Sequence, residues 1–132
     1  MTVETTRTMY GWLASSSAIT SLVSKPNIRL AYPKLDDSFP CISLIQAAGS
    51  NVVRLGYKTA TAGTKSRREN MFMQVDIWSK NGYYQVDSIG DEVEKVMASG
   101  GATKQSDNHD HDDGTGLYRK IMMFSYINFH DD

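Results

Sequence analysis

The clearest pattern of apolar and polar positions in this chain lies between Met71 and Met97. Residues 71–78 alternate, which places the apolar side chains on one face of a strand: Met71, Met73, Val75 and Ile77. After a turn that ends at Gly82, apolar residues recur at the spacing of an amphipathic helix: Val86, Ile89, Val93, Val96 and Met97. We therefore expect a strand followed by a helix near residues 83–98, packed together as two layers.

The first third of the chain predicts two helices and two short strands. Residues 3–14 have a helical pattern, and a shorter helix is expected over residues 18–23. Ser16 or Ser17 should cap the second helix, because serine hydroxyls bond to free backbone amides at helix starts. Alternation predicts strands over residues 28–32 and 41–46.

The remaining segments differ in polarity. Residues 117–129 predict a long strand, apolar on both faces toward its end, which is typical of a central or partner-covered strand. Residues 47–68 predict a long loop rich in glycine, threonine and basic residues, and residues 106–116 predict a polar turn. We therefore expect one α+β domain over residues 1–132. Its mixed, mostly antiparallel sheet of about four to five strands should be packed by the N-terminal helix and the helix near residues 83–98.

Composition narrows the classes of function. The chain has 132 residues, a formal charge of −1 and a pI near 6.3, which argues against wholesale binding to DNA or anionic membranes. No apolar run is long enough to span a bilayer, and the first residues lack the layout of a secretory signal. The single cysteine, Cys41, excludes an intrachain disulfide and indicates synthesis in a reducing cytoplasm.

Several segments, taken in order, carry a family resemblance. They are AITSLVS (residues 18–24), IRLAYP (28–33), FPCISL (39–44), VDIWSKNGYYQVDSIGDEVEKVM (75–97) and DDGTGLYRKIMMFSY (113–126). In this order and spacing, the chain resembles the tail-terminator, or tail-completion, proteins of long-tailed bacteriophages. The resemblance covers nearly the whole chain apart from the 47–68 segment, which is longer and more basic here than in many members.

The resemblance implies a structural virion protein with a mixed α/β fold, no enzymatic activity and no cofactor. Such proteins work as rings, commonly hexamers, at the head-proximal end of the tail. The implied partners are other copies of the chain, the tail tube protein and a head-completion or neck protein. Genomic DNA would pass through the lumen without specific binding, and the protein would be made in the cytoplasm of the host bacterium.

Basic residues of the 47–68 segment suggest a contact surface. Arg54, Lys58, Arg67 and Arg68 are candidate subunit-interface residues that would meet carboxylates of the next subunit. An alternative function uses the same basic loop at residues 54–68, in a small α+β module that binds nucleic acid or a ligand. Trp78 and Tyr126 are further interface candidates, because aromatic side chains often anchor protein contacts.

A cluster of histidines and aspartates is the other candidate for chemistry: Asp107, His109, Asp110, His111, Asp112 and Asp113. Such residues can hold a divalent metal, but the histidines fall where a calcium loop needs oxygen ligands. We favour a solvated acidic turn and expect no metal. No nucleophile elbow or phosphate-binding loop occurs in the sequence, and Cys41 suits a small core position, so no catalytic residues are predicted.

Overall fold

The computed structural model describes residues 2–30, 39–46, 51–54 and 66–131. The described elements follow in this order: α1 (Thr2–Ala14), α2 (Ser17–Thr20), the 3-10 helix η1 (Lys25–Asn27), β1 (Ile28–Arg29), β2 (Cys41–Gln46), β3 (Asn51–Arg54), β4 (Ser66–Ser79), α3 (Tyr83–Ser99), β5 (Thr103–Asp112) and β6 (Leu117–Asp131). The predicted helices near residues 3–14 and 83–98 are confirmed. Ser16 caps α2, as predicted, because its Oγ accepts a hydrogen bond from the backbone amide of Ile19 at 3.4 Å.

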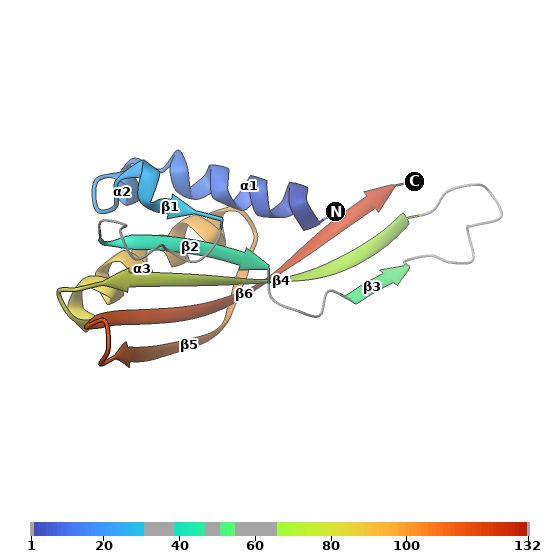
Figure 1. Ribbon diagram of the computed structural model, residues 1–132. Coiled ribbons are helices and arrows are strands. Elements are labelled where there is room, and N and C mark those ends of the chain that lie inside the picture. The colour runs from blue at the N-terminus through green and yellow to red at the C-terminus, as the bar shows by residue number, and fades with distance from the viewer. Residues whose placement is uncertain (1, 31–38, 47–50, 55–65, 132) are drawn as a thin grey trace.

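The strands form one mixed sheet in the order β1-β2-β4-β6-β5, and β3 pairs with β4 beyond this path (Figure 1). β1 and β2 are parallel, whereas the other described pairs are antiparallel. β4 and β6 form the centre of the sheet and pair from Ser66 opposite Asp131 to Ser79 opposite Tyr118. The α+β class and the mixed, mostly antiparallel sheet are confirmed, and β6 is a central strand.

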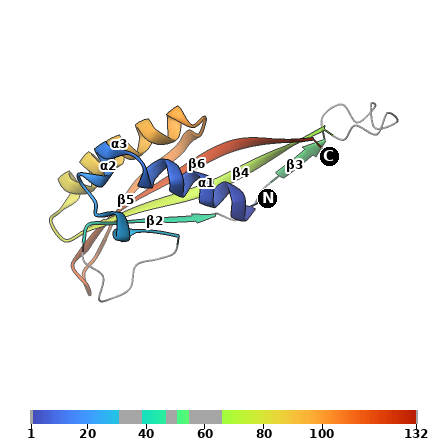
Figure 2. The ribbon, with the colours of Figure 1, turned by 90° about the horizontal axis from the view of Figure 1, so that it is seen from above.

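All three α-helices cover one face of this sheet (Figure 2). The predicted contact between the strand and helix layers is confirmed, since Val75 and Ile77 of β4 are buried in one cluster with Ile89 and Val93 of α3. Helix α1 adds Met9 and Leu13, among others, to this cluster. Each of these side chains is at most 1% exposed, which fixes the two-layer packing.

Beyond the helices, the sheet narrows into a projection that is seen in both ribbon views (Figures 1 and 2). We call it the arm: β3, residues 66–70 of β4 and residues 127–131 of β6. The predicted 47–68 loop therefore contains strand residues at both ends. The segment shows no sustained strand periodicity, because its hydrogen-bond partners come from long-range pairing: β3 pairs with β4, and the β4 residues pair also with β6. Residues 47–50 and 55–65, which include the interface candidate Lys58, lie outside the described residues.

Most of the predicted polar turn at residues 106–116 is in fact the strand β5, and the turn itself covers only residues 113–116. β5 pairs with β6 from Thr103 opposite Ser125 to Asp112 opposite Leu117, with a bulge between Lys104 and Ser106. Most of its side chains are exposed on both faces, so the strand lacks the apolar alternation from which a half-buried strand is predicted. β5 thus forms the exposed end of the described strand order.

Candidate functional site

The arm brings three of the predicted interface residues together. In the register of the strands, Arg54 lies opposite Arg67, and Arg67 lies opposite His130 on the other side. Arg68 occupies the next row, between Val53 and Phe129. Like charges at directly opposed positions of an antiparallel pair are destabilising, so this row favours an acidic partner. The arm is therefore a candidate binding surface for an anionic group.

The two predicted aromatic interface residues lie on opposite faces of the sheet. Trp78 faces away from the helices, where its Nε1 donates a hydrogen bond to Ser43 Oγ at 3.1 Å. Tyr126 lies on the helix face and packs edge-on against the Trp12 ring, with the ring centroids 5.7 Å apart. Both side chains are half-buried. The structure therefore does not join Trp78 and Tyr126 into one patch.

A buried ion pair holds the surroundings of Trp78. Asp76 has no exposed surface, and one of its carboxylate oxygens accepts a hydrogen bond from Arg119 at 2.5 Å. The Gln74 amide nitrogen lies 3.0 Å from each carboxylate oxygen of Asp76. The Arg119 guanidinium also lies 4.6 Å from the centroid of the Trp78 ring, within cation–π range. No local pattern indicates this cluster, although alternation along residues 71–78 places Asp76 and Trp78 on one face.

At the other side of the sheet, β5 and the turn after it carry four aspartates, which we call the acidic edge: Asp107, Asp110, Asp112 and Asp113. Two of them have local roles. Asp112 accepts hydrogen bonds from the backbone of Gly114 and the hydroxyl of Thr115, and these bonds hold its pKa below the usual value. Asp107 forms ion pairs with Lys104 and Lys120. Asp110 and Asp113 are exposed; Asp110 lies opposite Arg119 in the strand register, and His111 lies 3.0 Å from Asp113.

A nearly buried lysine joins the acidic edge to α3. Lys120 of β6 places its Nζ 2.9 Å from Asp87 and 3.1 Å from Asp107. Burial lowers the pKa of Lys120, but the hydrogen bonds to both carboxylates outweigh burial and raise the pKa overall. Burial likewise raises the pKa of Asp87 and of Asp107, yet their bonds to basic groups, Lys120 among them, lower both pKa values overall. β5, β6 and α3 are thereby fixed to one another.

The histidines of the predicted cluster take part in separate pairs. His109 Nε2 lies 2.6 Å from Asp87 Oδ1, and its ring stacks at 4.6 Å from the Tyr83 ring. The His111 ring lies 4.3 Å from the Tyr118 ring. Within the described residues, no group of three metal-ligating side chains converges. The side chains are exposed, as expected, but they project from a strand rather than from a turn.

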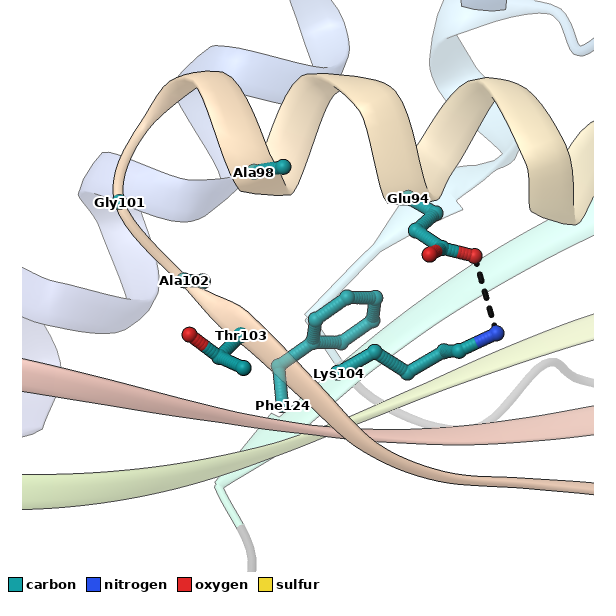
Figure 3. Close-up of a pocket in the computed structure, with 7 residues that line it drawn as sticks. All are labelled: Glu94, Ala98, Gly101, Ala102, Thr103, Lys104 and Phe124. Carbon is teal, nitrogen blue, oxygen red and sulfur yellow. Dashed lines mark ion pairs between the residues drawn. The ribbon is translucent and has the colours of Figure 1, made fainter.

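A groove of about 500 Å³ lies beside the acidic edge, between the end of α3 and the start of β5 (Figure 3). The ion pair between Glu94 and Lys104, 2.9 Å apart, spans its α3 and β5 sides. Phe124 lies beneath the groove with no exposed surface, and small residues complete the lining: Ala98, Gly101, Ala102 and Thr103. The groove offers shape and apolar area, features suited to a protein contact.

The fold and its surfaces define a class of protein: a structural α+β module with a basic arm and an acidic sheet edge. None of its described helices is long and apolar enough to cross a membrane. The chain belongs to the tail completion protein gp17 family, whose model matches residues 7–127. It is a structural, non-enzymatic protein of phage tail completion, as the resemblance implied.

Comparison with solved structures supports the fold. A chain of the structure described as the virion of a native gene transfer agent particle superposes with a TM-score of 0.67. The similarity covers 92% of both chains at 12% sequence identity, so it establishes a common fold. No curated protein matches the sequence.

Proposed function

We propose that this tail completion protein forms a ring that caps the tail tube and joins the tail to the head-completion proteins. We expect six copies in the ring, located at the head-proximal end of the tail. One face would stack on the last ring of tube protein, and the other would receive a neck protein. The genome would pass through the lumen without specific binding.

The observation that carries this proposal is the difference between the two ends of the sheet. The arm presents Arg54 opposite Arg67, whereas β5 and its turn carry the acidic edge. Unlike surfaces on one chain suit head-to-tail contacts, which close into a ring when the rotation per copy divides the circle. A protein that met only one copy of itself through a two-fold axis would instead need one self-complementary patch.

The predicted interface residues have different parts in this proposal. Arg54, Lys58, Arg67 and Arg68 would contact carboxylates of a neighbouring copy or of the tube. Trp78 and Tyr126 are half-buried, and each has a ring or cation contact within its own chain. Because these two lie on opposite faces of the sheet, they would either contact different neighbouring proteins or pack beneath the residues that make those contacts.

Electron microscopy of particles made without this protein tests the proposal. We expect tails of uncontrolled length, or tails of normal length that fail to join heads, and we expect supplied wild-type protein to restore joined particles. Purified tubes incubated with the protein should acquire a ring at one end only. Joined, infectious particles assembled in its absence would contradict the proposed function.

A further inference from the structure

We propose that the acidic edge of one copy receives the basic arm of the next copy. This inference rests on the proposed ring and names the surfaces that would close it. Two independent features of the sheet point to the contact: a row of basic residues across the arm, and an exposed acidic strand at the end of the strand order.

The first feature is the cross-strand row of the arm. Arg54 and Arg67 are directly opposed, and His130 continues the row on β6. Both arginines remain charged at any physiological pH. Because opposed like charges weaken a strand pair, the row is at its most stable when carboxylates or phosphates lie against it. An anionic surface bound to the arm would therefore reduce the repulsion between these opposed basic residues.

The second feature is the outer side of β5. Within the described part of the chain, β5 pairs only with β6, so its outer backbone groups face no described strand. An exposed sheet edge can bind an added strand, and β3 has a second side of its own that no described strand occupies. Two copies of β5 would place aspartates against aspartates, which disfavours symmetric pairing of this edge. A basic strand is its electrostatic complement.

A second copy of the chain explains both features better than nucleic acid does. The same sheet carries the basic row and the acidic edge, so each copy offers what its neighbour lacks. The formal charge of −1 gives the whole chain no attraction for a polyanion. Complementary charges also favour one direction of the contact, because edge against edge repels, and the arm, whose three arginines outnumber Glu69 and Asp131, prefers the acidic edge to another arm.

Charge reversal tests the contact. One variant changes the arm, Arg54→Glu with Arg67→Glu, and a second changes the edge, Asp110→Lys with Asp113→Lys. Asp110 and Asp113 are chosen because both are exposed and lie outside the Lys120 network. Arg7→Glu and Asp91→Lys are the matched controls, since both side chains are exposed on helices. Ring formation is measured by light scattering and by electron microscopy, for the protein alone and with tail tubes.

We expect each reversed variant to associate about tenfold or more weakly than wild type, with the controls unchanged. A chain that carries both reversals, or an equal mixture of the two variants, should regain ring formation, because every contact is again between opposite charges. In assembled wild-type rings, backbone amides of residues 106–112 should exchange hydrogen more slowly than in the free chain.

Three outcomes would overturn the inference while leaving the proposed ring in place. Reversed variants could form rings as well as wild type, the doubly reversed chain could fail to recover despite a native melting curve, or residues 106–112 could remain unprotected in rings. Loss of binding to double-stranded DNA by the arm variant, with rings unaffected, would instead assign the arm to nucleic acid. Absence of any wild-type ring, with or without tubes, would contradict the proposed function itself.

Discussion

Gly90 leaves the space that the side chain of Lys120 occupies. A β-carbon added at Gly90 would lie 2.7 Å from both Cδ and Cε of Lys120, closer than van der Waals contact allows. The lysine cannot easily move aside, because its ammonium group is bonded to Asp87 and Asp107. A glycine in the middle of α3 thus permits a charged residue of β6 to reach the acidic edge from beneath the helix.

We expect Gly90→Ala to destabilise the protein for this reason. Alanine is favoured over glycine in a helix by about 1 kcal/mol, but overpacking costs about 1–3 kcal/mol, so the net loss should be at most about 2 kcal/mol. Gly11→Ala is the control, because a β-carbon at Gly11 of α1 meets nothing within 4 Å. Urea denaturation measures both variants, and the control should be as stable as wild type or more so. Equal gains at the two positions would show that Lys120 moves freely.

The Lys120 network predicts a loss of stability in acid. Asp87 and Asp107 have pKa values lowered from the ordinary 3.8, so their ion pairs stabilise the folded state fully above that pH. Their contribution is lost as the pH falls through the lower, folded-state pKa values. The raised pKa of Lys120 gives the opposite dependence, with stability lost only as the pH rises beyond 10.5.

Denaturation midpoints measured from pH 2 to pH 7 test this dependence. The Lys120→Met variant keeps an aliphatic chain of similar length but removes the charge, so its acid dependence should be shallower than that of wild type. The same slope in both proteins would mean that other carboxylates control acid unfolding. Since the Asp87 side chain is 45% exposed, salt should weaken the effect.

The core between α3 and β4 predicts a large effect of truncation. Ile89 is 1% exposed and lies in the cluster that includes Val75 and Ile77. Ile89→Ala should cost about 2–5 kcal/mol through lost apolar contact and the cavity left behind. Tyr84→Ala on the same helix is the control, because Tyr84 is 87% exposed and its loss should change the free energy of unfolding little. A similar cost for both would contradict the assignment of the helix faces.

The contrast between β4 and β5 explains how far sequence alone leads here. The sequence predicts β4 because Met73, Val75 and Ile77 alternate with more polar residues, and it predicts α3 because apolar residues then recur at helical spacing. In both elements the local spacing of apolar residues indicates which side is buried. β5 has no buried face along most of its length, and its aspartates and histidines give the local pattern of a turn. What makes it a strand is pairing with β6, a relation between segments rather than within one.

The candidate surfaces follow the same rule. The basic residues of the arm were predicted as an interface from composition, but their cross-strand row depends on β3 meeting β4 and β4 meeting β6. Lys120 and Asp87 are 33 positions apart, and no local pattern indicates that they pair. The sequence therefore suggests which residues form contacts, whereas the residues that they contact are known only from the folded structure.

The described geometry of the histidines predicts that chelators leave the protein unchanged. His109 bonds to Asp87 and His111 to Asp113, so the two imidazoles serve different carboxylates. Thermal unfolding with and without EDTA should give the same midpoint, and added zinc should not raise it. A metal that binds only the folded state would raise the midpoint with concentration, and a shift of several degrees would revive the metal-site hypothesis.

The pair formed by Asp76 and Arg119 should contribute more than any exposed ion pair. Arg119→Met removes the guanidinium that bonds to a carboxylate with no exposed surface, and uncharged Gln74 would be the described side chain still bonded to Asp76. Leaving such a charge buried should cost about 3 kcal/mol. The double variant Asp76→Asn with Arg119→Met should recover part of that loss, because the buried charge is gone.

Lys95→Met breaks the exposed pair with Glu92 and should cost under about 1 kcal/mol. These three variants and the single variant Asp76→Asn, compared with wild type by chemical denaturation, measure the coupling, and additive losses in the double variant would show that Asp76 does not depend on Arg119.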